Sequence, residues 1–292
     1  MNAPFAIEAD RVWFSYPDGF VALQDVLFQV RSGEFVAMLA SNGSGKTTLI
    51  KVLVGLLKPQ KGTVRINGRD LRSVPHTDLY QRVGLVFQNP NDQLFGATVA
   101  EDVAFGPRNL GLDESEVQQR VTDALEAVAA ASLRERAIQH LSFGEQKRVA
   151  IAGVLAMKPS ILILDEPTAG LDPAGEHSMM HLLGDLNRRH GITIVLATHS
   201  VDTLPLFADR IYLLSRGCVL RQGPPATVFC DQELINRASL RLPYVSRLLD
   251  ELKRFDGVPI DGLPLTLGEA RQQLLDLIPQ ELIAAPLTGG KS

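Results

Sequence analysis

Hydrophobic residues form short runs along much of the chain, and polar residues or turn signals bound each run. Runs of four to six mostly apolar residues predict strands buried on both faces, because neither face then needs polar side chains. They cover residues 35–39, 83–87, 161–164 and 192–197. Between the second and third runs the pattern becomes helical, with Ala, Glu and Val at helical spacing in residues 113–131. We expect a helical subdomain over about residues 98–158.

The two ends of the chain differ from this middle part. Residues 7–30 contain two β-rich stretches separated by a Pro-Asp-Gly turn, and residues 210–222 have the pattern of a β-hairpin. Beyond them, short helical segments are interrupted by prolines, and we expect residues 286–292 to be frayed. These patterns predict one domain over residues 1–229 and a small helical appendage over residues 230–292.

A glycine-rich turn follows the first buried run. It consists of Ala40, Ser41, Asn42, Gly43, Ser44, Gly45, Lys46 and Thr47, and a helical pattern begins at Thr48, which is also a candidate for nucleotide binding. A strand, such a turn and a helix in this order can bind phosphate through backbone N–H groups and the helix N-terminus. Lys46 would reach the β- and γ-phosphates, and the Thr47 hydroxyl would bind Mg²⁺. The alternative is an ordinary turn with a surface lysine.

The first position of this turn departs from the usual phosphate-loop pattern. Ala40 stands where glycine is usual. Alanine is tolerated there only if the φ angle of Ala40 is negative, because a Cβ atom disfavours positive φ. We therefore expect Ala40 to adopt the extended conformation at the end of the strand.

Polar residues follow three other strands at their carboxyl ends, where α/β sheets bind ligands. Asp165 and Glu166 come directly after the run at 161–164. Asp165 could hold Mg²⁺ through water, and Glu166 could polarise an attacking water. Gln88 and His199 follow two further strands, and His199 could contact a γ-phosphate. The alternatives are a plain loop glutamine and a structural histidine.

An aromatic side chain near the phosphate loop is a candidate for contact with a nucleotide base. Tyr16 could stack on adenine, an interaction worth roughly 1–3 kcal/mol per base. Strand alternation places Phe14 and Tyr16 on one face and Trp13 on the other, so packing within a sheet explains Tyr16 equally well.

Two helices carry weaker signals. Ser142 and Gly144 precede a helix predicted over residues 146–157 and could form a second anion-binding end, although serine is a common N-cap. His177 and His181 are four residues apart on the helix after Pro173, a spacing that can bind a metal. No third ligand is evident, so a solvated helix face is the alternative.

Composition limits the classes of function. The chain has 292 residues and a net charge of −4, which argues against a nucleic-acid partner. The two cysteines lack a CxxC spacing, and the first residues lack the apolar segment of a secretion signal. The apolar run at 149–157 is too short to span a bilayer, which needs about 20 residues. We expect a soluble protein whose membrane role, if any, comes through a partner.

The motifs taken together resemble those of one family. Their order along the chain is the phosphate loop at 40–47, Gln88, LSFGE at 141–145, ILILDE at 161–166, AGLD at 169–172 and His199. This set resembles the ATP-binding subunit of ABC transporters over about residues 7–225. The resemblance implies an α/β P-loop NTPase fold of the ABC ATPase type. Such a fold has a RecA-like core, an antiparallel β subdomain and an inserted helical subdomain.

The resemblance also implies a role for each matching residue. Tyr16 would stack on adenine, and Lys46 and Thr47 would bind phosphate and Mg²⁺. Gln88 would be the Q-loop residue near Mg²⁺, and Asp165 the Walker B acid. Glu166 would be the catalytic base, Asp172 the D-loop residue and His199 the switch histidine. Phe143 and Glu145 depart from the usual LSGGQ signature, whereas Ser142 and Gly144, the implied γ-phosphate contacts, are retained.

A narrower resemblance concerns the energy-coupling-factor group, and within it the cobalt/nickel importer ATPases. Residues 87–112, 148–159 and 240–253 carry it. It implies ATP and Mg²⁺ as cofactors and a peripheral place at the cytoplasmic face of the inner membrane. The implied partners are a second copy of the chain, a transmembrane coupling subunit and a substrate-binding membrane subunit. A vitamin importer of the same group is the alternative.

Two other classes of ABC ATPase are disfavoured. Those that act in DNA repair or chromosome work insert long coiled coils or zinc modules before the signature turn. Here Lys46 and Ser142 are only 96 positions apart, enough for a small helical subdomain. The stretch at 87–112 argues against the ATPase of a lipid or drug exporter.

Overall fold

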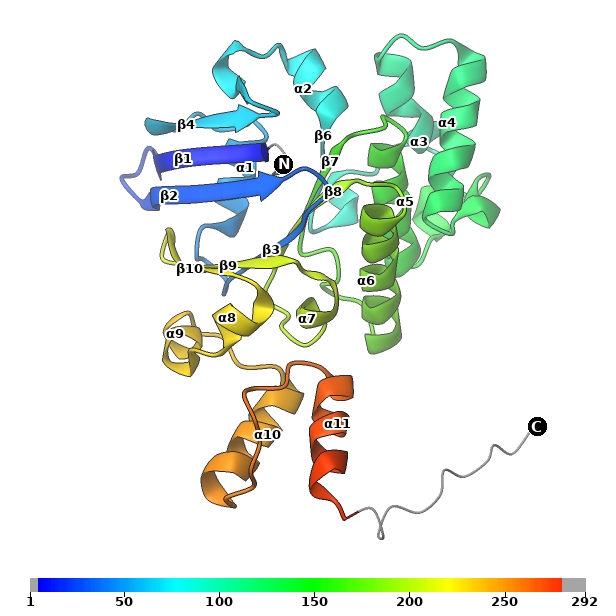
Figure 1. Cartoon of the computed structure of the whole chain (residues 1–292). Coiled ribbons are helices and arrows are strands. Elements are labelled where there is room, and N and C mark those ends of the chain that lie inside the picture. The colour runs from blue at the N-terminus through cyan, green and yellow to red at the C-terminus, as the bar shows by residue number, and fades with distance from the viewer. Residues whose placement is uncertain (1–4, 280–292) are drawn as a thin grey trace, which may run out of the picture.

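The computed structural model describes residues 5–279 and contains two sheets that pack in one body (Figure 1). The larger sheet has the strand order β10-β9-β3-β8-β7-β6, and the smaller sheet has the order β2-β1-β4-β5. The strands are β1 (Phe5–Ser15), β2 (Val21–Arg31), β3 (Phe35–Leu39), β4 (Lys61–Ile66), β5 (Arg69–Asp70), β6 (Val83–Val86), β7 (Ile161–Asp165), β8 (Thr193–Thr198), β9 (Arg210–Ser215) and β10 (Cys218–Gly223).

Helices connect and cover these strands. They are α1 (Lys46–Leu53), α2 (His76–Arg82), α3 (Val99–Asn109), α4 (Glu114–Ala127), α5 (Phe143–Leu155), α6 (Pro173–Arg188), α7 (Leu204–Phe207), α8 (Pro225–Phe229), α9 (Gln232–Arg237), α10 (Tyr244–Phe255) and α11 (Leu267–Leu277). Short 3-10 turns occur at Leu71–Ser73, Pro90–Asp92, Ala131–Leu133 and Ile138–His140. The expected α/β architecture is confirmed, with an antiparallel sheet, a mainly parallel core sheet and a helical subdomain.

The larger sheet is buried on both faces, which explains the unbroken apolar runs. Phe35, Ala37 and Leu39 of β3 belong to one apolar core, whereas Val36 and Met38 belong to the other. The first core lies under the helical subdomain and α6, and the second contains α1 and the inner face of the smaller sheet. Strand alternation therefore sends every side chain of β3 into a core.

The helical subdomain consists of α3, α4 and α5, which lie beside the larger sheet (Figure 1). Polar side chains cap all three N-termini. Thr98 and Ser142 form capping boxes with the glutamate three residues later, and Asp113 accepts a hydrogen bond from the Glu116 backbone N–H. Each such cap contributes about 0.5–2 kcal/mol to helix stability.

The start of α5 differs from the sequence-based expectation. The helix begins at Phe143 and not at Gln146, because Ser142 is the N-cap and Glu145 occupies the third helical position. The pattern Ser-x-x-Glu is itself a sequence signal for a helix start. Gly144 consequently lies in the first helical turn rather than in a loop before it.

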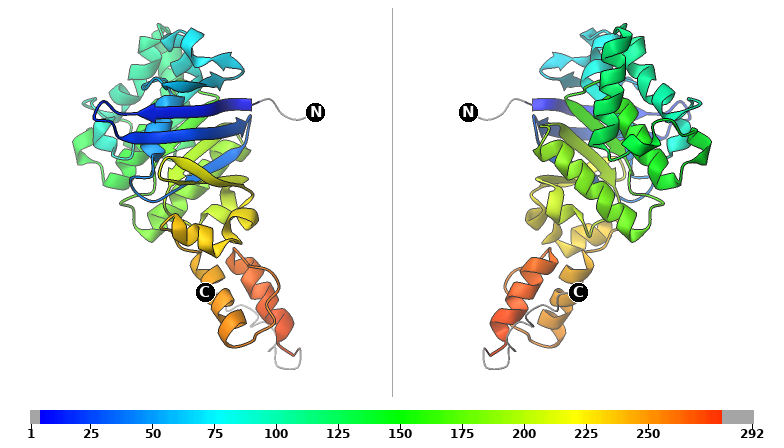
Figure 2. Two further views of the ribbon diagram at one scale, coloured as in Figure 1. Left: turned by 90° about the vertical axis from the view of Figure 1, so that its left-hand side faces the viewer. Right: turned by 90° about the vertical axis from the view of Figure 1, so that its right-hand side faces the viewer.

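The C-terminal helices fall into two groups. Ile235 and Leu242 contribute to the main core, whereas Leu249, Ile260 and Ala270 form a small core of their own. Figure 2 shows α10 and α11 projecting from the body as a helical pair. A domain division at 229/230 stays a prediction, and the expected fraying at 286–292 lies outside the described residues.

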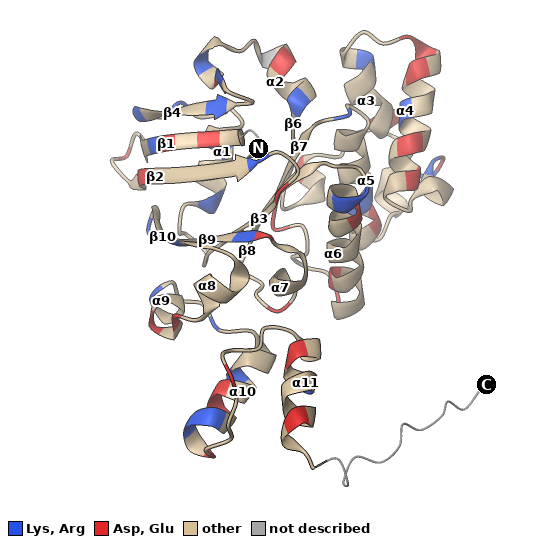
Figure 3. Cartoon of the chain, in the orientation of Figure 1, with Lys and Arg blue, Asp and Glu red and all other residues tan. Residues whose placement is uncertain are grey.

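Charged side chains of both signs occur along α4 and α10 (Figure 3). Glu116 pairs with Arg120 on α4, and Arg247 pairs with Glu251 on α10, each at i,i+4 spacing. Such pairs stabilise a helix by about 0.2–0.5 kcal/mol. Within residues 5–279, no helix combines the length and apolarity needed to cross a bilayer.

Candidate functional site

Four neighbouring parallel strands bring the predicted site residues to one edge of the larger sheet. In the order β3-β8-β7-β6, the strands are followed by the phosphate loop, His199, Glu166 and Gln88, and Asp165 is the last residue of β7. The register aligns these ends, since Leu39 pairs with Thr198 and Asp165 pairs with Ala197. The topology therefore gathers residues that are far apart in the sequence.

The first residue of the phosphate loop, Ala40, does not use the backbone freedom of glycine. Ala40 is buried, its N–H donates to the Thr198 carbonyl over 3.1 Å, and its φ is not positive. The expectation that Ala40 avoids a positive φ is thus confirmed. Gly45, in contrast, has a φ of 101°, and a Cβ there would lie 2.7 Å from the Ala22 carbonyl oxygen. Glycine is required at position 45 for both conformation and space.

The loop contains a buried hydroxyl group that is suited to an incoming ligand. Among the described residues, Ser44 Oγ is one of two buried side-chain oxygen or nitrogen atoms without a hydrogen-bond partner, and Ser44 is 4% exposed. A buried polar atom without a partner is costly, so such atoms in native structures usually mark a site for water, an ion or a ligand. A phosphate oxygen would accept this hydrogen bond.

Lys46 is buried in the centre of the loop. Its Nζ donates to the carbonyl oxygens of Ala40, over 2.6 Å, and Ser41, over 3.2 Å. The same nitrogen lies 3.3 Å from Glu166 Oε1. The ammonium group is thus held within the phosphate loop, in contact with the acid that follows β7.

Thr47 and Asp165 form a pair of oxygen groups suited to Mg²⁺. The Thr47 hydroxyl donates to Asp165 Oδ2 over 2.8 Å. Burial raises the pKa of Asp165, and the Thr47 hydrogen bond opposes that shift. Hydroxyl and carboxylate oxygens are the donors that Mg²⁺ prefers, and a divalent cation would stabilise the ionised carboxylate in this buried position.

Glu166 is the buried acid at the centre of the site. Its side chain is 5% exposed, and its carboxylate oxygens lie 2.9 and 3.0 Å from His199 Nδ1. Glu166 also has a φ of 48°, which for a residue other than glycine costs of order 1–3 kcal/mol. This backbone conformation aims the carboxylate at Lys46 and His199 instead of continuing the strand.

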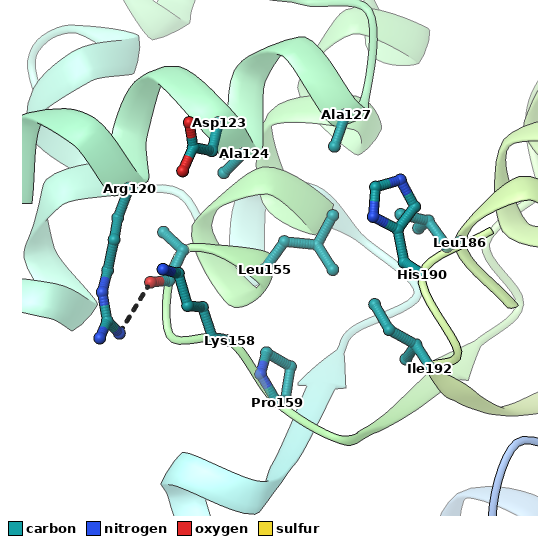
Figure 4. Close-up of a pocket in the computed structure, with 11 residues that line it drawn as sticks. Arg120, Asp123, Ala124, Ala127, Leu155, Lys158, Pro159, Leu186, His190 and Ile192 are labelled. Carbon is teal, nitrogen blue, oxygen red and sulfur yellow. Dashed lines mark hydrogen bonds between the residues drawn. The ribbon is translucent and has the colours of Figure 1, made fainter.

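These groups line a cavity of about 220 Å³. Its walls consist of Phe20, residues 41–48, Gln88, Asp165 and Glu166. A larger cavity of about 490 Å³ lies between α4, the end of α5 and the loop before β8 (Figure 4). Its walls are mostly apolar, and Arg120 there contacts the Ala156 carbonyl. Because the groups that can bind phosphate line the smaller cavity, we assign the candidate site to it.

Six predicted residues do not line this cavity. Two of them, Ala40 and His199, are hydrogen-bonded to residues that do, namely Lys46 and Glu166. Ser142 and Asp172 are exposed helix N-caps, and Gly144 lies in the first turn after Ser142. Tyr16 is half-buried, with its hydroxyl 3.0 Å from Thr48 Oγ1 and its ring edge-on to Phe14. Tyr16 thus contacts the phosphate loop, whereas Ser142, Gly144 and Asp172 are not among the residues that line the cavity of their own chain.

Sequence reasoning missed three residues around the site. Phe20 is 58% exposed and lines the cavity, and Gln93 links the Phe87 N–H to the Ala150 carbonyl of α5. Lys147 is 3% exposed, and burial lowers its pKa to about 8. No local pattern identifies these contacts, because each depends on an element distant in sequence.

The two helix histidines lie close together, with ring centroids 4.3 Å apart, and His181 also contacts Phe207. Within the described part of the chain, no cluster of three or more His, Cys, Asp or Glu could hold a metal. The pair at positions 177 and 181 therefore has no third ligand in residues 5–279.

Comparison with known proteins agrees with this arrangement. The family model described as ABC transporter matches residues 23–169. An energy-coupling factor transporter ATP-binding protein EcfA of Methanocaldococcus jannaschii is 45% identical over 95% of this chain and 99% of its own length. A putative ABC transporter ATP-binding protein of Geobacter sulfurreducens is 56% identical over 91% of this chain and 95% of its own length.

Solved structures give the same result. The structure of cbiO1 from Clostridium perfringens, described as part of the ABC transporter complex cbiONQ, matches with a TM-score of 0.75 and 40% identity, over 85% of this chain and 99% of that one. An ATP-binding cassette solved as a dimer with ADP and phosphate matches with a TM-score of 0.68 and 30% identity, over 75% and 98%. The chain therefore belongs to the ABC transporter family, as an ATP-hydrolysing subunit of the energy-coupling-factor type.

Proposed function

We propose that this chain hydrolyses MgATP at the cavity between the phosphate loop and β7, and that it thereby powers import of a transition metal ion. The observation that carries the proposal is the meeting of Lys46, Glu166 and His199 beside the partnerless Ser44 hydroxyl. A cation, an acid and an imidazole at the mouth of a phosphate loop suit phosphoryl transfer to water.

Each group has a distinct task in this reaction. The loop N–H groups and Lys46 bind the phosphates, and Thr47, Gln88 and Asp165 would hold Mg²⁺. The metal ion, when bound, neutralises charge on the phosphate oxygens. Glu166 accepts a proton from the attacking water, and His199 holds the carboxylate and reaches the γ-phosphate.

We infer a head-to-tail homodimer from the residues that lie outside the cavity. Ser142, Gly144 and Asp172 are not at the cavity of their own chain, so a second chain would supply them. In a two-fold dimer each ATP would lie between the phosphate loop of one chain and Ser142 of the other. One chain contains every group that the two sites need, which favours two identical copies over pairing with a paralogue.

An apolar surface beside the Q-loop is proposed as the docking site for a membrane subunit. Two adjacent apolar residues, Leu94 and Phe95, follow Gln88 in a polar loop, and this sequence predicts that both are exposed. Leu94 instead packs against the main core. Phe95 is 65% exposed and instead stacks edge-on with Phe105 at 4.6 Å, beside a cavity of about 380 Å³. Exposed apolar residues around a hollow are typical of an interface.

Replacing Phe95 and Phe105 together by serine should abolish co-purification with the membrane subunits. The soluble chain should remain folded, because both side chains are largely exposed. Replacement of exposed Phe255 on α10 by serine provides a matched control. Unchanged assembly of the double variant would contradict the docking surface.

Cobalt is the proposed substrate, with nickel second, and the basis is the likeness to the cobalt/nickel importer ATPases together with the match to cbiO1. The chain would act at the cytoplasmic face of the membrane as a peripheral subunit, together with a coupling subunit and a substrate-binding subunit. A vitamin importer of the same group is the second candidate, since relatives named only as energy-coupling factor proteins match equally well.

Uptake by a reconstituted complex, with this chain as its only ATPase, tests both the substrate and the homodimer. We expect labelled cobalt to accumulate in vesicles on addition of ATP. Accumulation of a vitamin, with neither cobalt nor nickel taken up, would contradict the substrate. A requirement for a second, different ATPase chain would contradict the homodimer.

A further inference from the structure

We propose that Lys147 is a positioning residue that fixes the main chain of Glu166 from the signature helix α5. This inference rests on the proposed role of Glu166 as general base. Lys147 lies in the second turn of α5, four residues after Phe143, and its side chain points into the protein, where it is 3% exposed. A lysine this buried is uncommon unless its ammonium group has a specific partner.

The partner is the carbonyl oxygen of Glu166. Lys147 Nζ donates to this oxygen over 3.1 Å, and the Ala169 N–H donates to the same atom over 3.1 Å. On the other side, the Glu166 N–H donates to the Ala197 carbonyl over 2.8 Å. Both peptide groups of a residue with φ of 48° are therefore held by hydrogen bonds, one of which comes from a different subdomain.

Phe143 completes the connection between α5 and the loop after β7. The Lys147 ammonium lies 5.1 Å from the Phe143 ring centroid, which favours the charged form by a cation–π contact. The same ring lies against Gly170, where an added Cβ would come within 2.9 Å of it. Phe143 stands where the usual signature has glycine, so this chain has an aromatic contact there that glycine could not make.

The consequence is that the position of the helical subdomain determines the orientation of Glu166. Moving α5 would break or lengthen the Lys147–Glu166 bond and release the carboxylate from its constrained direction. Displacing a catalytic group by about 1 Å can lower a rate by roughly 100-fold. Lys147 is bonded to the Glu166 backbone and does not itself line the phosphate cavity, so its effect should fall on turnover and not on ATP binding.

A double-mutant cycle between Lys147→Met and Glu166→Gln tests this role in the full-length chain. Methionine replaces the unbranched apolar part of the side chain but removes the terminal ammonium group and with it the hydrogen-bond donor. In the otherwise unchanged protein, Lys147→Met should lower kcat by roughly 10- to 100-fold and change KM for ATP less than threefold. In the Glu166→Gln background, the single-turnover rate should change less than twofold, because the group being positioned is gone.

Arg148→Met is the matched control on the same helix. Arg148 donates to the Val128 carbonyl and to Ser178 Oγ, and it does not contact Glu166. Its effect should be equal in both backgrounds. Thermal unfolding of each variant, and turnover counted per ATP-binding site, separate a misfolded fraction from slow chemistry.

Two results would overturn the inference. One is an unchanged kcat for Lys147→Met, and the other is an equal loss in both backgrounds, which would mean that Lys147 acts independently of Glu166. A near-normal rate of Glu166→Gln alone would instead contradict the general-base assignment. Failure of the positioning role of Lys147 can therefore be distinguished from failure of the general-base role of Glu166.

Discussion

The phosphate loop and the signature turn are both glycine-containing turns at a helix N-terminus, yet their surroundings differ. Ser44 and Lys46 are 4% and 6% exposed, and Lys46 has one partner in the loop, Ala40, and another directly after β7, Glu166. Ser142 is exposed, and its hydroxyl is already used to cap its own helix. The difference fits the proposed dimer, in which one half of the ATP site is assembled within the chain and a second chain supplies the other half.

A pair of serine variants would sharpen this comparison. Ser44→Ala removes a hydroxyl expected to donate to phosphate and should weaken ATP binding by about 10- to 100-fold, the equivalent of roughly 1.5–3 kcal/mol. Ser142→Ala should leave ATP binding unchanged at chain concentrations where the protein is monomeric, but should lower hydrolysis under dimer-forming conditions. Equilibrium binding of a fluorescent ATP analogue and steady-state hydrolysis measure the two effects.

If Ser44→Ala and Ser142→Ala lost ATP affinity equally, the proposed division of the ATP site between two chains would be contradicted. The stability of the variants provides the control. Loss of the Ser142 cap should cost about 1 kcal/mol. Loss of the Ser44 hydroxyl should be nearly neutral without ATP, because that buried group has no partner to leave unpaired.

A smaller effect concerns the pH dependence of stability. Burial lowers the pKa of Lys147 from its ordinary 10.5 to about 8, and the nearby Glu166 charge only partly opposes this. Between these two values the unfolded chain binds more protons than the folded chain, so stability should rise with pH. Relative to Lys147→Met, the free energy of unfolding should therefore increase from pH 8 to pH 10. A difference that stays flat or falls across this range would show that Lys147 is not desolvated as described.

Much of the core and of the site could be predicted from local patterns. The runs ending at Leu39 and Asp165 are recognisable because both faces of the sheet are covered, and polar residues directly after such strands lie at a ligand-binding edge. The start of α5 was also encoded, in the capping pattern of Ser142 and Glu145, although the prediction began the helix at Gln146.

Other features depend on contacts that no window of sequence contains. Helical periodicity does not reveal that Lys147 is buried, because its partner is 19 residues away at the end of a strand. Leu94 and Phe95 are adjacent apolar residues in the same loop, but only Leu94 packs against the main core. Phe95 is exposed and contacts Phe105. Tertiary packing decides these cases.

The central claim is that Glu166 activates water for attack on ATP held by the phosphate loop. The most direct test is the hydrolysis rate and the ATP affinity of Glu166→Gln, measured side by side with the unaltered chain. The account predicts that ATP binding is retained and that turnover falls by roughly 10²- to 10⁴-fold, because the replacement keeps the shape of the side chain and removes its basicity. Near-normal hydrolysis by the variant would contradict it.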